Sequence, residues 1–66
     1  MNVYAAVIIA ETYGEEELQD PKKEKEYLEA WQLLIDTGMC WQLQGWFGRT
    51  AMHMIELGHC KPPPEK

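Results

Sequence analysis

The fold is decided by residues 20–38, which read DPKKEKEYLEAWQLLIDTG. Asp20 suits a helix cap because its carboxylate accepts hydrogen bonds from the free amides of the first turn, and Pro21 has no amide to leave unpaired there. Gly38 is typical of the left-handed residue that closes a helix. We therefore predict a helix over residues 21–37, with one apolar face formed by Tyr27, Leu28, Trp31, Leu34 and Ile35.

An amino-terminal helix is predicted over residues 3–12, because apolar residues repeat there with a helical period. Gly14 ends it, and residues 15–20 form a polar connection to the next helix. We expect the core-facing side of this helix to consist of Val3, Tyr4, Val7 and Ile8.

On the carboxyl side we predict a short helical turn near residues 39–44, a tight corner at Gly45–Gly48 and a last helix over residues 49–57. The inward residues of that helix are Ala51, Met54 and Ile55. The predicted fold class is all-α, a small bundle of three main helices over residues 3–12, 21–37 and 49–57 with the short turn near 39–44.

Residues 35–40 and 55–60 follow one pattern, an Ile, an acid, any residue, Gly, any residue and Cys. Two copies are too few for a solenoid, which needs at least three to bury a continuous core. We interpret them as two helices with the same stop signal. Residues 1–60 are predicted to form a single helical domain, and residues 61–66, with three consecutive prolines, an extended tail.

Length and charge bound the function. A chain of 66 residues with a net charge of -5 allows one domain with a marginal core, too small for a fully enclosed active site. The apolar run at residues 3–10 has no basic residue before it and is too short to span a bilayer, so we expect no secretion signal and no membrane partner.

Cysteine and histidine raise the question of a metal or a nucleophile. Residues 40, 53 and 59 have the ligand spacing of part of a Cys2His2 zinc finger, but the cysteine that should pair with Cys40 is missing. No third group stands out to orient a Cys–His pair for catalysis. We therefore expect no enzyme activity, no cofactor and no metal, the weak metal candidates being Cys40, His53, His59 and Cys60.

The loop Gly45–Gly48, followed by Arg49 and Thr50, suggests a nucleic-acid alternative. Such a loop can clamp a phosphate backbone, and the flanking helices could form a helix-turn-helix with Arg49 and Thr50 at the start of the reading helix. Affinity for nucleic acid comes mainly from neutralised phosphates, and this acidic chain contains a single Arg and no basic stripe. Nucleic acid is therefore the less favoured partner.

A protein partner is favoured by the aromatic residues Trp41, Trp46 and Phe47, which crowd together in a domain too small to enclose all of them. Exposed aromatic clusters commonly anchor protein interfaces. The amino-terminal part is strongly acidic and could contact a basic surface, as nucleic-acid mimics do. The predicted interface residues are Trp41, Trp46, Phe47, Glu15, Glu16 and Glu17.

Four segments carry a resemblance to a known family: LIDTG at residues 34–38, WQLQG at 41–45, FGRTA at 47–51 and MIELGHC at 54–60. With them the chain resembles a group of short proteins of unknown function that tailed bacteriophages and prophages encode. The resemblance implies a phage origin and a site of action in the cytoplasm of the infected bacterium. It brings no established activity or catalytic residues.

The function that we predict is an accessory protein that binds a host protein, such as a defence nuclease or the transcription machinery, and modulates or inhibits it. Two alternatives stay open. One is a helix-turn-helix-like regulator that binds nucleic acid, and the other is a structural homodimer in which the aromatic segment packs against its own copy.

Overall fold

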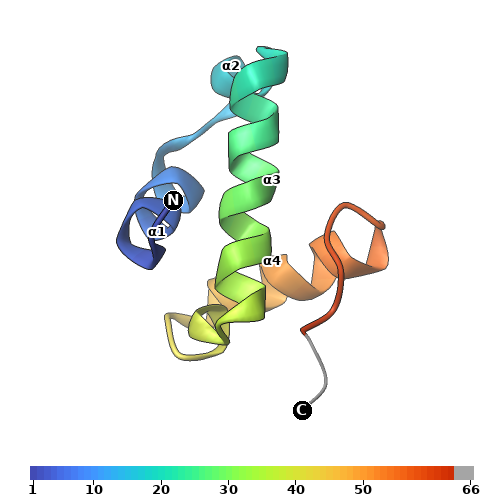
Figure 1. Ribbon diagram of the computed structural model, residues 1–66. Coiled ribbons are helices and arrows are strands. Elements are labelled where there is room, and N and C mark those ends of the chain that lie inside the picture. The colour runs from blue at the N-terminus through green and yellow to red at the C-terminus, as the bar shows by residue number, and fades with distance from the viewer. Residues whose placement is uncertain (64–66) are drawn as a thin grey trace.

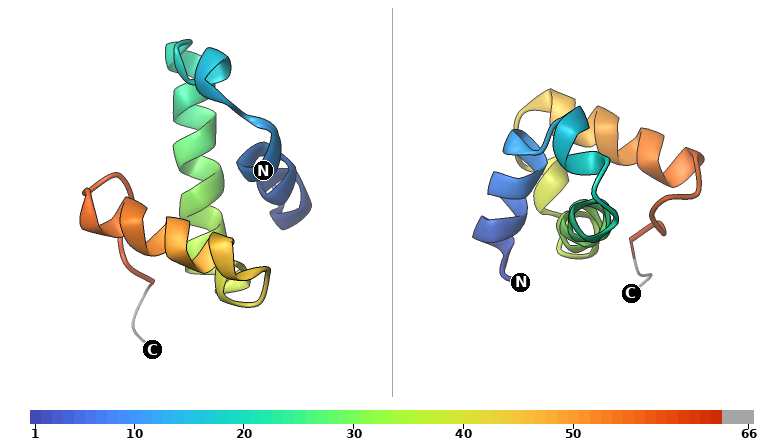
Figure 2. Two further views of the ribbon diagram at one scale, coloured as in Figure 1. Left: turned by 180° about the vertical axis from the view of Figure 1, so that it is seen from behind. Right: turned by 90° about the horizontal axis from the view of Figure 1, so that it is seen from above.

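The computed structural model describes residues 1–63 and is all-α in that range, as predicted. Helix α3 (Pro21–Asp36) is the central element of the molecule (Figure 1). Helix α1 (Val3–Thr12) packs crosswise against one side of α3, the single-turn helix α2 (Glu15–Leu18) lies beside its amino end, and α4 (Gly45–Glu56) crosses it near its carboxyl end (Figures 1 and 2). A 3-10 turn, η1 (Met39–Trp41), joins α3 to α4.

The prediction for α3 is confirmed in its ends and in its buried face. The Asp20 carboxylate accepts a hydrogen bond of 2.9 Å from the Lys22 amide, and Pro21 occupies the first turn. Trp31, Leu34 and Ile35 are fully buried. These side chains form the centre of a core to which α1, η1 and α4 also contribute.

The predicted inward face of α1 is confirmed for Val3 and Val7, which pack against the core, and is wrong for Tyr4 and Ile8. Tyr4 is 81% exposed and Ile8 is 60% exposed, whereas the buried residues of α1 are Ala6 and Ala10. Since α1 is apolar on nearly every side, its periodicity cannot indicate which side faces the core. The two alanines have the smallest side chains of the helix, so burying them brings its backbone close to α3.

Residues 15–20, predicted as a polar connection, contain the helical turn α2. The Gly14 amide donates a hydrogen bond of 2.9 Å to Glu17 Oε2, which is the half of a capping box that a glycine N-cap can form. Glu15, Glu16 and Glu17 lie at the amino end of α2, where the helix dipole favours negative charge. A run of acids that suggests a solvated loop therefore also stabilises a short helix.

The connection into α4 also differs from the prediction. The helical turn expected near 39–44 is confined to η1, and α4 begins at Gly45 rather than at residue 49. The segment Gly45–Gly48, predicted as a tight corner, is the first turn of α4. The chain bends before it, at Gln44, whose ψ of 152° is extended. The two glycines favoured a loop, but the packing of Phe47 against the core outweighs their weak helix propensity.

The Gln32 side chain holds Lys61, near the end of the described chain, against α3. The Lys61 amide donates to Gln32 Oε1 at 2.8 Å, and Gln32 Nε2 donates to the Lys61 carbonyl oxygen at 3.1 Å. Lys61, the first residue of the predicted tail, is thus hydrogen-bonded to the helical domain. Residues 64–66 of that tail lie outside the described residues. Within residues 1–63, no helix has the length and apolar character needed to cross a membrane.

Candidate interaction surface

The predicted aromatic interface divides into buried and exposed members. The rings of Phe47 and Trp46 stack at 3.8 Å between centroids, and the Phe47 ring lies 5.9 Å from that of Trp31. Phe47 is 2% exposed, so it belongs to the core and its assignment to a partner surface is wrong. Trp46 is half-buried, and its Nε1 donates to Gln44 Oε1 at 3.3 Å. These contacts hold the start of α4 against α3.

Trp41 is the exposed member of the set, with 43% of its surface accessible. A Cβ built on Gly48 would lie 3.4 Å from Trp41 Cε3, and one built on Gly38 would lie 3.9 Å from Trp41 Cδ1. The indole ring therefore lies close to both Gly38, which follows α3, and Gly48 of α4. Because neither glycine has a side chain, a wide ring packs close to the backbone and still presents part of its surface to solvent.

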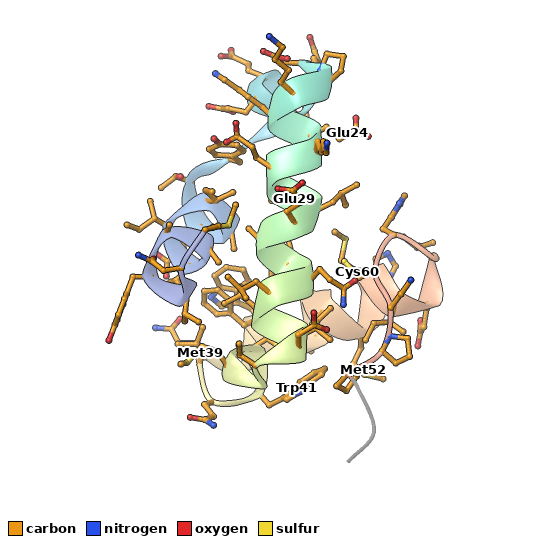
Figure 3. All side chains as sticks on the ribbon, in the orientation of Figure 1. Glu24, Glu29, Met39, Trp41, Met52 and Cys60 are labelled. Carbon is orange, nitrogen blue, oxygen red and sulfur yellow. The ribbon has the colours of Figure 1, made fainter. Side chains whose placement is uncertain are left out.

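Met52 extends this exposed apolar area along α4. It follows Gly48 by one helical turn, so both residues lie on the same side of the helix, and it is 50% exposed. Figure 3 shows Trp41 and Met52 at the same end of the molecule. We call the area formed by Trp41, Gly48 and Met52 the Trp41–Met52 surface.

The acidic candidates lie at the other end of α3. Glu15, Glu16 and Glu17 belong to α2, beside the amino end of α3, whereas Trp41 follows its carboxyl end (Figures 1 and 3). The hydrogen bond from the Gly14 amide lowers the pKa of Glu17, so this carboxylate is committed to its own helix turn. Glu15 and Glu16 are fully available to solvent contacts. Since the molecule is 34 Å along its longest axis, the acids and the Trp41–Met52 surface are separate features.

The cysteines and histidines do not converge on one point. Cys40 and Cys60 are buried free thiols, and burial raises the pKa of both, while His53 and His59 are exposed. Within the part of the chain that the structure describes, no three residues of the metal-binding types His, Cys, Asp and Glu come together. The chemistry available there is that of protonated, water-excluded thiols, which are poor nucleophiles and poor metal ligands.

The residues of the nucleic-acid alternative lie on the first half of α4. Arg49 is exposed and Thr50 is half-buried. The helices α3 and α4 meet at a corner, as in a helix-turn-helix, but residues 37–44 separate them, a longer connection than the turn of about three to four residues typical of that motif. Apart from His53, Arg49 is the one basic side chain of α4.

An open groove of about 300 Å³ was not predicted from the sequence. Residues far apart in the sequence form it, so no local motif signals it. It joins apolar side chains to one acid and one imidazole. Its lining residues are Leu18, Glu24, Tyr27, Leu28, Met54 and His59.

The fold and its surfaces define a small all-α domain with a partly exposed tryptophan and two buried free thiols. The chain belongs to the DUF7417 family, a domain of unknown function whose family model matches residues 3–65. No curated protein and no solved structure matches the sequence. The predicted membership of a family of unknown function is therefore confirmed.

Proposed function

We propose that this chain is a phage-encoded accessory protein that binds a host protein in the bacterial cytoplasm and modulates or inhibits it without catalysis. The phage origin rests on the resemblance of residues 34–60 to short phage and prophage proteins. Binding as the mode of action is supported by the exposed apolar area at one end of a domain of 66 residues. The candidate partners among the host proteins are a defence nuclease and a component of the transcription machinery.

The observation that carries the proposal is the exposure of Trp41 on a rigid support. Tryptophan and methionine are enriched in protein interfaces, and a small number of such anchors contribute most of the binding free energy. The Trp41 ring is positioned by Gly38 and Gly48, so little side-chain freedom is lost when a partner covers it. Met52 offers a second apolar contact with an adaptable shape.

The acidic end supports a second, electrostatic contribution. Glu15, Glu16 and the acids of the first half of α3 would attract a basic partner and raise its rate of association. Lys22, Lys23 and Lys25 lie in the same region and offset part of this charge. Mimicry of nucleic acid is therefore a secondary hypothesis. In it, the basic partner would contact both the acidic end and the Trp41–Met52 surface.

A non-catalytic role is supported by the state of the two thiols. The groups with the best nucleophilic chemistry in the sequence are Cys40 and Cys60, and both are buried with raised pKa values. At neutral pH they are protonated, so neither attacks a substrate readily.

The test is affinity capture from host lysate with the tagged chain, its Trp41→Ala and Met52→Glu variants, and Leu57→Ala as the matched control. Leu57 is 57% exposed and lies roughly 140° around α4 from Met52. We expect one host protein in stoichiometric amount, captured by the native chain and by Leu57→Ala and lost with both surface variants. Circular dichroism checks that every variant is folded.

Two results would contradict the proposal. Capture that is unaffected by both Trp41→Ala and Met52→Glu would remove the Trp41–Met52 surface from the interface. Capture that disappears on nuclease treatment, falls steeply with salt and requires Arg49 would establish the nucleic-acid alternative instead.

A further inference from the structure

The outer side of α1 is the second apolar area of the molecule, and the Trp41–Met52 surface does not include it. Met1 is 58% exposed, Tyr4 is 81% exposed and Ile8 is 60% exposed. Tyr4 and Ile8 are one turn apart on the face of α1 opposite the buried Ala6 and Ala10, and Met1 precedes the helix. We call this face the α1 strip.

The exposure of the strip is unusual for the composition of the helix. α1 reads VYAAVIIAET, so apolar side chains surround it on almost every side. A helix of that kind is normally covered on all sides, whereas α3 covers one side of α1 here. An exposed Tyr and an exposed Ile one turn apart therefore indicate a surface that is buried in an assembly.

The charges of α1 point to the occupant. Glu11 is the one charged residue of the helix, its first turn contains no acid and its last turn contains no base. The helix dipole therefore lacks a compensating charge at the amino end, where an anion would be stabilised. A second copy of α1, running antiparallel, would bring its Glu11 to that end.

We propose that the α1 strip is the interface of a homodimer in which the two α1 helices pack antiparallel about a two-fold axis. With the axis between Tyr4 and Ile8, the Tyr4 of each copy packs on the Ile8 of the other. The same arrangement places each Glu11 near the amino end of the opposite helix and keeps the two carboxylates apart. A parallel pair would instead bring the Glu11 side chains together, and their like charges would repel.

The need for a second copy follows from the size of the core. The buried apolar residues of the described chain include four alanines and two cysteines, so much of the core consists of small side chains. Domains of this size commonly gain stability from oligomerisation. A symmetric contact uses the same patch on both copies, so one apolar strip suffices to complete it.

Sedimentation equilibrium of the full chain over a wide concentration range tests the proposal. We expect a monomer–dimer equilibrium, and Ile8→Glu should raise its dissociation constant by about tenfold or more because the charge would be buried in the interface. Tyr4→Glu should act in the same way, and it covers the case in which Ile8→Glu fails to fold. Leu57→Glu is the matched control, since Leu57 is 57% exposed and caps the carboxyl end of α4. The carboxyl end of α4 and helix α1 lie on opposite sides of α3 (Figure 1).

Glu11→Gln reports the orientation of the two helices. It should weaken an antiparallel dimer, whose Glu11 lies at a helix amino end, and strengthen a parallel one, whose carboxylates repel. A monomer at all concentrations, a dimer that survives both strip variants or a dimer strengthened by Glu11→Gln would overturn the proposal. Trp41→Ala should abolish capture of the host protein but leave the dimer intact. The proposed function and the dimer can therefore fail independently.

Discussion

The segments Ile35–Cys40 and Ile55–Cys60 have the same sequence pattern and begin in the same way. In each, the helix ends at the acidic residue, after which a glycine adopts a positive φ, 76° at Gly38 and 81° at Gly58. Each glycine amide donates to the carbonyl oxygen of the Ile at 3.1 Å. Both cysteines that follow are buried.

After the glycines the two segments diverge. The first continues into η1, where the Trp41 amide donates to the Gly38 carbonyl oxygen at 3.2 Å. In the second, the His59 amide donates back to the Met54 carbonyl oxygen at 2.9 Å, and the chain turns toward α3 and meets Gln32. The shared pattern thus determines the turn, whereas contacts with distant residues determine the path after it.

The largest difference between the segments concerns their isoleucines. Ile35 is fully buried and Ile55 is half-buried. We expect Ile35→Ala to lower the free energy of unfolding by about 3–4 kcal/mol and Ile55→Ala by about 1–2 kcal/mol, since the cost of a cavity follows burial. Urea unfolding followed by circular dichroism measures both, and equal losses would mean that the two helix ends are equally integrated in the core.

The second-largest difference is expected between the free energies of unfolding that are lost on substituting the two cysteines. Cys60 Sγ faces the Leu28 carbonyl oxygen at 3.9 Å, whereas Cys40 is 1% exposed among apolar neighbours. Cys40→Ser should cost about 2 kcal/mol, because it buries a hydroxyl without a good partner, and Cys60→Ser about 1 kcal/mol. Cys→Ala at each position is the control for lost volume. A greater loss at Cys60 would contradict the difference that we infer.

Gln32 is hydrogen-bonded to Lys61, directly after the second segment, so substituting it should affect that segment more than the first. Gln32→Ala removes two hydrogen bonds to Lys61 and should cost about 1–2 kcal/mol. It should also speed the alkylation of Cys60 more than that of Cys40, because it releases the chain next to Cys60. Rates for the two thiols are separable by mass spectrometry of peptides. Gln42→Ala, at an exposed glutamine, is the matched control and should change neither rate.

The glycines test what the two segments share. Gly38→Ala and Gly58→Ala should each cost about 1 kcal/mol, since both need a left-handed backbone. Gly48→Ala should instead leave the protein equally stable or stabilise it by up to about 1 kcal/mol, because alanine favours helix and its Cβ would meet Trp41 at an ordinary 3.4 Å. Thermal unfolding of the three variants measures these changes in stability. A loss at Gly48 comparable to the other two would show that Trp41 cannot move.

The smallest expected effect is a dependence on alkaline pH that both segments share. Burial raises the pKa of the Cys40 and Cys60 thiols above the ordinary value of 9.0. The stability linked to these groups is therefore fully present below that value and is lost as the pH rises through the folded-state pKa. Urea unfolding at neutral and alkaline pH should show a smaller decrease for the Cys40→Ala/Cys60→Ala double variant than for the native chain.

The parts of the fold that local signals specify could be predicted from the sequence. The cap at Asp20, the apolar face through Trp31 and the stop at Gly38 all lie within one segment, and they identify α3 correctly. The inward face of α1 could not be predicted, because a helix with Val, Ile, Tyr and Ala on all sides has no distinct apolar face. The start of α4 was misplaced because Gly45 and Gly48 resemble a loop until Phe47 is seen to enter the core.

The candidate site was predictable as a region but not residue by residue. The density of aromatic side chains between residues 41 and 47 indicates that some of them are exposed, and Trp41 is. Which ones are exposed depends on how α4 crosses α3, and no spacing in the sequence encodes that crossing. Met52 joins Trp41 only through this packing, and the groove at Leu28 and His59 arises in the same way.

Trp31 gives the molecule an optical property of its own. It is fully buried beside Tyr27, Trp46 and Phe47, and among residues 1–63 no acceptor pairs with its Nε1. An indole emits at shorter wavelengths when no polar groups relax around its excited state. Trp31 should therefore fluoresce toward the blue and Trp41 toward the red. One emission spectrum would report the integrity of the core at its short-wavelength side and the occupancy of the Trp41–Met52 surface at its long-wavelength side.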